Sequence, residues 1–118
     1  MANVIEELAR LVVKAAEDKK AENILTLDIS KLSVIADYFI ICHGNNERQV
    51  QAIAGEIRDQ VYKHGYQVRG IEGADEGRWV LIDLGDVVVH VFHKEERDFY
   101  HIERLWSEAE HVSLSKQA

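Results

Sequence analysis

Two apolar runs separated by Gly85-Asp86 constrain the fold of this 118-residue chain more than any other stretch. A glycine and an aspartate between alternating apolar segments predict a two-residue hairpin turn, which joins strands over 78–84 and 87–92. Such a turn fixes the register of the pairing. Because side chains alternate along each strand, the hairpin must present two faces, and their compositions differ sharply.

One predicted face is purely aliphatic, and we expect helices to pack against it. Its members are Val80, Ile82, Leu84, Val87, Val89 and Val91. The opposite face carries Trp79, Leu81, Asp83, Val88, His90 and Phe92, with Trp79 opposite Phe92 in the predicted register. Aromatic anchors on a mixed face are typical of a protein-binding surface. The alternative is that the first or last helix covers this face and that Asp83 and His90 bond to each other diagonally.

The remaining patterns predict a single α/β (α+β) domain with a mixed sheet of about five strands and helices mainly on one face. Capping boxes at Asn3 with Glu6 and at Asn46 with Gln49 begin two helices. The expected helices cover 3–18, 46–64 and 99–106, and the other expected strands cover 24–29, 37–43 and 66–71. A charged turn over 94–100 leads into the last helix. We expect the domain to span 1–107, and a polar tail over 108–118 to be a frayed helix end or disordered.

The charge balance limits the classes of partner. Fourteen Lys and Arg against twenty-one Asp and Glu give a formal charge of -7. Such a chain has no long-range attraction to nucleic acid or anionic lipid, but it suits a basic protein. The acidic N-terminus is unlike a signal peptide, and the longest uncharged apolar stretch, 38–42, is too short to cross a bilayer. We therefore expect a cytoplasmic protein that binds no membrane.

The residues offer little catalytic chemistry. His90 and His93 point to opposite faces of one strand, so we expect no metal site. Cys42 lies in an apolar strand and is predicted to be a buried, unreactive thiol, and no cofactor is expected. The rival interpretation is a nucleotidyltransferase-like enzyme, which would bind a nucleotide at the 44–48 bend and depend on Asp83 or Asp86.

Three blocks of the sequence resemble the Iojap family, the ribosomal silencing factors. The blocks are 37–41 leading into 44–54, Gly73 followed by 79–92, and Arg97 followed by Phe99-Tyr100 and Leu105-Trp106. The resemblance covers residues 3–107. The chain departs from the family pattern at Asn45, where Ser or Thr is common.

The resemblance implies a factor without catalysis, with a nucleotidyltransferase-like fold that lacks the catalytic carboxylates. It implies binding to the large ribosomal subunit through ribosomal protein L-fourteen, which blocks joining of the small subunit; relatives in organelles act in large-subunit assembly. A homodimer through the mixed hairpin face is a further alternative. The expected partner-binding residues are Trp79, Leu81, Asp83, His90 and Phe92 of the hairpin, Glu72, Asp75 and Glu76 of the acidic loop, and Arg97 and Tyr100 downstream.

Overall fold

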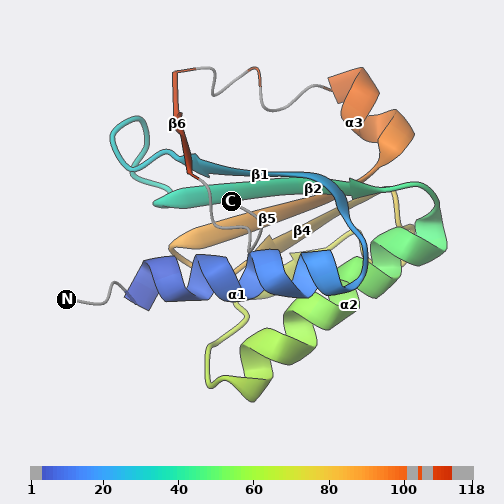
Figure 1. The fold of residues 1–118 in the computed structure, drawn as a ribbon, viewed down its shortest axis with the longest axis horizontal. Helices are drawn as coiled ribbons and strands as arrows, with labels where there is room; N and C mark the ends of the chain where they lie inside the picture. Colours follow the sequence, from blue (N-terminus) through green and yellow to red (C-terminus); the bar gives the residue numbers. More distant parts are fainter. Residues whose placement is uncertain (1–3, 101–103, 105–107, 113–118) are drawn as a thin grey trace.

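The computed structural model describes residues 4–100, 104 and 108–112, which form one α+β domain with a mixed sheet (Figure 1). Three helices and six strands are present in this part of the chain. The helices are α1 (Val4–Asp18), α2 (Glu47–Lys63) and α3 (Lys94–Tyr100). The strands are β1 (Glu22–Asp28), β2 (Tyr38–Gly44), β3 (Gly70–Glu72), β4 (Trp79–Asp83), β5 (Val87–His93) and β6 (Glu110–Val112).

The strand order of the sheet is β3-β4-β5-β2-β1-β6. The central pair, β2 and β5, is parallel, with Tyr38 opposite Val87 and Gly44 opposite His93. The other described pairs are antiparallel. Both central strands therefore end at the same edge of the sheet, where β2 leads into α2 and β5 leads into α3.

The register predicted for the hairpin is confirmed. Trp79 pairs with Phe92 and Asp83 with Val88, and the Leu84 N–H donates to the Val87 carbonyl over 2.9 Å. The turn needs a left-handed first residue, and Gly85 supplies it with a φ of 89°. Local turn chemistry therefore sets the register of β4 and β5.

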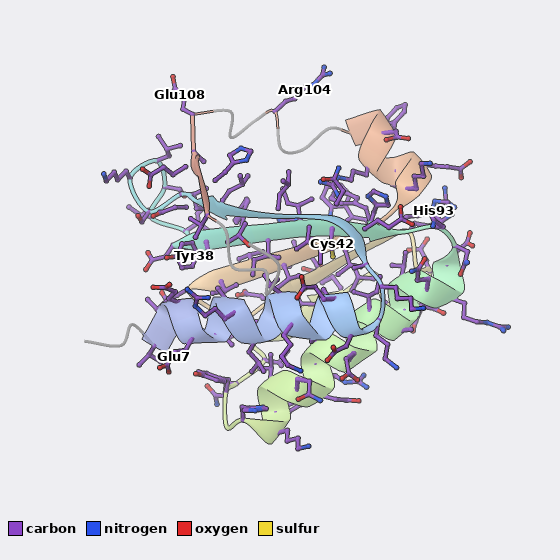
Figure 2. All side chains as sticks on the ribbon, in the orientation of Figure 1. Glu7, Tyr38, Cys42, His93, Arg104 and Glu108 are labelled. Carbon is purple, nitrogen blue, oxygen red and sulfur yellow. The ribbon has the colours of Figure 1, made fainter. Side chains whose placement is uncertain are left out.

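The aliphatic face of the hairpin is buried beneath α1 and α2, as predicted (Figure 1). All six of its aliphatic residues belong to the main core, together with Ile53 and Ile57 of α2. Figure 2 places Cys42 in the same layer, where burial raises the pKa of its thiol to about 12. The thiol is therefore protonated and enclosed, in line with the prediction of an unreactive cysteine.

The start of α2 follows its predicted capping box with one difference. The Asn46 side-chain oxygen accepts the Gln49 N–H over 2.8 Å, as expected. The Gln49 side chain reaches back to the N–H of Asn45, not of Asn46. The other predicted box, at Asn3, lies outside the described residues.

Two elements differ from the expectations from sequence. The stretch expected as a charged turn is helix α3, because Glu95 and Glu96 suit a helix start and His93 Nδ1 accepts the Glu95 N–H over 3.1 Å. Strand β3 begins at Gly70, not at residue 66, because the Tyr66 N–H still bonds to the Val61 carbonyl at the end of α2.

The tail expectation is also wrong for three residues. Glu110–Val112 form β6, which pairs with Thr26, Leu27 and Asp28 of β1 and raises the strand number from about five to six. The expected helix over 99–106 overlaps α3 at two residues, and most of its remainder lies outside the described residues. The domain boundary at residue 107 stays a prediction. Within the described part, every helix is too short or too polar to span a membrane.

Candidate partner-binding site

Trp79 opens β4 at the edge where the parallel strands end, and its indole is only partly buried. The indole Nε1 donates a hydrogen bond to Nδ1 of His90 over 3.1 Å. Its ring lies 4.9 Å from the ring of Phe92, centroid to centroid. The side chains of His90 and Phe92 on β5 thus fix the indole, while part of the indole stays accessible to solvent.

His90 and Phe92, two residues expected on the partner-binding face, are buried. His90 is 4% exposed and Phe92 is fully buried. A second core cluster lies on this side of the sheet, and Phe39 of β2 packs edge-on against His90 at 5.0 Å. The cluster contains Leu27, Ile29, Ala36, Phe39, Ile41, Val88, Phe92 and Ala109. The hairpin face is therefore core along β5 and surface along β4.

The environment of His90 fixes its charge state. Burial lowers the pKa of His90 to about 4, so the imidazole is neutral near pH 7. Because Nδ1 accepts the indole N–H, the proton of the neutral ring sits on Nε2, which has no hydrogen-bond partner within the described part of the chain. The alternative interpretation has Asp83 and His90 bonded diagonally. In the described part of the chain Asp83 instead accepts the Gly85 N–H over 2.9 Å.

A shallow surface hollow remains beside the indole, and we name it the Trp79 hollow. It is lined by Glu72, Gly73, Trp79 and Leu81. Asp75 and Glu76 are exposed on the loop that follows β3. Asp75 also lines a separate hollow against α2. At the Trp79 hollow, the apolar side chains of Trp79 and Leu81 adjoin one carboxylate, that of Glu72, a combination suited to a basic partner.

Two contacts shape the acidic loop beside this hollow. Gly73 adopts a φ of 82°, and a Cβ there would lie 2.1 Å from the Trp79 carbonyl oxygen. The Gln51 side chain of α2 donates to the carbonyls of Ala74 and Asp75, each over 3.0 Å. The loop is thus pinned against both β4 and α2, which positions its carboxylates.

Arg78 ties three elements together next to Trp79, a role that sequence reasoning missed. Its guanidinium bonds to Glu47 of α2 at 3.0 Å, to Glu95 of α3 at 3.0 Å and to Glu96 of α3 at 2.6 Å. The hydrogen bond that Arg78 donates to Glu96, and to a smaller extent the one to Glu95, raises the pKa of Arg78. No local spacing predicts this clasp, because its partners lie 31, 17 and 18 residues away in sequence.

The structure describes the side chain of only one of the two downstream residues of the predicted set, Arg97 and Tyr100. Arg97 is buried at 3% exposure, which corrects the expectation of a surface residue. Its Nη1 donates to the Asn23 carbonyl over 2.6 Å and lies 3.0 Å from Nδ1 of His43. Tyr100 ends α3, and its side chain lies outside the described residues. Whether any residue of the predicted set contacts a partner stays a prediction.

Several groups on which the nucleotidyltransferase-like alternative would depend make contacts within the chain. At the start of α2 the N–H groups of Asn45 and Gln49 are bonded to side chains of the chain itself. Asp83 caps the hairpin turn, and Asp86 is exposed beyond it. Across the described residues, no three His, Cys, Asp or Glu side chains converge as metal ligands.

Comparisons with known proteins point to one family. The sequence profile described as "Ribosomal silencing factor during starvation" matches residues 2–118. The ribosomal silencing factor RsfS of Bacillus subtilis (strain 168) is 57% identical over 104 residues, 88% of each chain. The mouse protein "Mitochondrial assembly of ribosomal large subunit protein 1" is 28% identical over 102 residues, 82% of this chain and 44% of the mouse protein.

The fold has close counterparts among solved structures. A crystal structure of a protein from Bacillus halodurans matches with a TM-score of 0.82 and 50% identity. The match covers 91% of this chain and 97% of that one.

Proposed function

The chain belongs to the family of the ribosomal silencing factors, and from this premise we propose that it binds the large ribosomal subunit and represses translation. The proposed contact is ribosomal protein L-fourteen, a basic partner at the face that meets the small subunit. The proposed site of action is the cytoplasm.

The observation that carries this proposal is the Trp79 hollow, where a partly exposed indole lies beside the carboxylate of Glu72. A partly exposed indole whose orientation is fixed by His90 and Phe92 suits the centre of an interface, where aromatic side chains supply most of the binding energy. The carboxylates of Glu72, Asp75 and Glu76 suit lysine or arginine on the partner. The net charge of -7 opposes direct contact with ribosomal RNA.

The proposed mechanism is steric and needs no bond to be made or broken. A bound factor fills space that the small subunit would occupy, so inhibition follows the fraction of large subunits that carry the factor. Repression therefore requires the concentration of free factor to exceed its dissociation constant for the large subunit. A role in large-subunit assembly is the second candidate, favoured by the name of the mouse relative.

The experiment compares two variants in co-sedimentation with purified bacterial large subunits. Trp79→Ala should weaken binding about 30-fold, which corresponds to about 2 kcal/mol. Tyr62→Ala, which removes an exposed aromatic ring from α2, should bind like the original chain. Equal binding by Trp79→Ala and the original chain would contradict the proposed site.

A second measurement separates silencing from assembly. Added protein should lower the yield of joined ribosomes from mature large and small subunits, in proportion to occupancy. If the protein binds immature large subunits alone and leaves joining of mature subunits unaffected, the assembly role replaces the silencing role.

A further inference from the structure

The loop between β1 and β2 exposes three large apolar side chains. Leu32 is 44% exposed, Ile35 is 69% exposed and Val34 is fully exposed. Single exposed apolar residues are ordinary on protein surfaces, but a group of three within four positions is a feature of interaction sites. Nothing in the proposed role of the Trp79 hollow accounts for this group.

Hydrogen bonds hold the loop in a defined shape. Ile29 and Ala36 are buried on either side of the exposed group, and the Ile29 N–H donates to the Asp37 carbonyl over 2.9 Å. The Ile35 N–H donates to the Ser33 hydroxyl over 3.0 Å. The Asp37 N–H is bonded to the Asp86 carbonyl over 2.8 Å, which ties the loop to the hairpin turn. The apolar side chains are therefore presented by an ordered loop.

Negative charge lies beside Leu32, one member of the exposed group. Leu32 borders a hollow lined by Asp28, Lys31, Leu32, Glu108, Ala109 and Glu110. Three carboxylates thus face a single lysine there, and Figure 2 shows Glu108 at this end of the molecule. Hydrogen bonds from Ser30 lower the pKa of Asp28, which keeps its carboxyl ionised. The exposed Asp86 adds another acid at the base of the loop, and Arg69 lies beside Gly85 on the same turn.

We infer that the β1–β2 loop docks a cationic, partly apolar protein segment of the large ribosomal subunit, at a place separate from the Trp79 hollow. This inference rests on the proposed function. Local charge argues against RNA and against an anionic lipid surface, since either would be repelled. It also argues against a second copy of this acidic chain, and three side chains fall well short of the roughly 800 Å² per partner of a stable dimer.

The two contact places lie at opposite ends of β5. The loop leads into Tyr38, which pairs with Val87 at the start of β5, whereas Trp79 pairs with Phe92 near its end. Five residue steps at about 3.3 Å each separate these positions by roughly 17 Å. Figure 2 shows Tyr38 and His93 at the two ends of the sheet. Two weak contacts on one rigid partner reinforce each other, because the first raises the local concentration for the second.

The test uses a photo-crosslinker attached to the thiol of Val34→Cys in the full chain, mixed with purified large subunits. Cys42 is fully buried and does not compete for the label. The label at position 34 should crosslink to a basic ribosomal protein. The same label at Tyr62→Cys, another exposed site, on α2, is the control and should give no such product. Crosslinks from position 34 to ribosomal RNA, to a second copy of the chain or to nothing would overturn the inference.

Binding measurements separate this inference from the proposed function. Val34→Ser/Ile35→Ser should weaken co-sedimentation with large subunits about tenfold, and Tyr62→Ser should leave it unchanged. If the original chain binds and the loop variant binds equally well, the loop inference fails alone. If the original chain does not bind large subunits, the proposed function fails and the inference fails with it.

Discussion

The indole N–H of Trp79 donates to Nδ1 of His90 across the β4–β5 pair, over 3.1 Å. The donor is partly exposed and the acceptor is buried, so one hydrogen bond connects the surface to the second core cluster. The bond requires a neutral imidazole, and burial supplies that condition. We therefore predict that His90 positions the proposed anchor from within the core and does not itself contact the partner.

Replacing His90 should affect binding as well as stability. His90→Leu removes the acceptor and should lower the free energy of unfolding by about 1–2 kcal/mol, because the indole N–H loses its partner. It should also weaken large-subunit binding several-fold, since the indole is no longer fixed. Val88→Ala is the control, because it trims the same cluster without touching this bond. If both variants bind subunits like the original chain, His90 has a structural role only.

The stability of the protein should depend on pH through His90. The unfolded residue takes up a proton below about pH 6.5, whereas the folded one does so only near pH 4. Between these values the unfolded state binds more protons, so the free energy of unfolding falls as the pH drops through this window. The total loss is on the order of 3 kcal/mol at about 1.4 kcal/mol per pH unit.

Urea unfolding between pH 4 and pH 7 measures this loss. His90→Gln, which does not titrate, should flatten most of the slope. Some slope should remain, because burial and the nearby Arg97 lower the pKa of His43 in the same direction. A slope equal to that of the original chain would mean that His90 is not the titrating group.

Local sequence rules predicted the features that depend on neighbouring residues. The register of β4 and β5 follows from the Gly85-Asp86 turn, and the start of α2 follows from Asn46. The aliphatic face of the hairpin followed from simple alternation. The family resemblance was confirmed over the same stretch of chain.

Long-range contacts limited the prediction of the site. The burial of His90 comes from β2, whose Ile41 pairs with it and whose Phe39 packs against its ring, about fifty residues earlier in sequence. The guanidinium of Arg97 contacts His43 and Asn23, which precede it in sequence by 54 and 74 positions. Composition marks such residues as polar. The pairing of β2 with β5 encloses His90, and contacts of α3 with β1 and β2 enclose Arg97.

Gly73 should tolerate no side chain. A Cβ at this position would lie 2.1 Å from the Trp79 carbonyl oxygen, and its φ of 82° disfavours other residues. Gly73→Ala should therefore lower the free energy of unfolding by on the order of 2 kcal/mol or more. Gly55→Ala in α2 is the control, since its Cβ would meet nothing nearer than 3.9 Å, and it should stabilise by about 0.5–1 kcal/mol. Thermal unfolding of the two variants should shift in opposite directions.

Arg97 should stabilise the fold through its buried guanidinium. Arg97→Leu leaves the Asn23 carbonyl and His43 Nδ1 without this donor, so the free energy of unfolding should fall by about 3 kcal/mol. Lys94→Leu changes an exposed cation of the same helix and should stay within about 0.5 kcal/mol of the original chain. Chemical denaturation compares the two. A small loss for Arg97→Leu, equal to that of the control, would contradict the structural role of Arg97.

Charge reversal at Glu76 should slow association with the large subunit. Glu76 is exposed on the acidic loop, whereas Asp83 caps the hairpin turn, so Glu76 reports on electrostatics without disturbing the fold. In Glu76→Lys the association rate should fall several-fold and its dependence on salt should weaken, because one attraction to the basic partner becomes a repulsion. Asp59→Lys makes the same charge change on α2 and should alter the rate less. Stopped-flow association at two salt concentrations distinguishes a local effect at Glu76 from an effect of net charge. Equal slowing by Glu76→Lys and Asp59→Lys would contradict a basic partner at the Trp79 hollow.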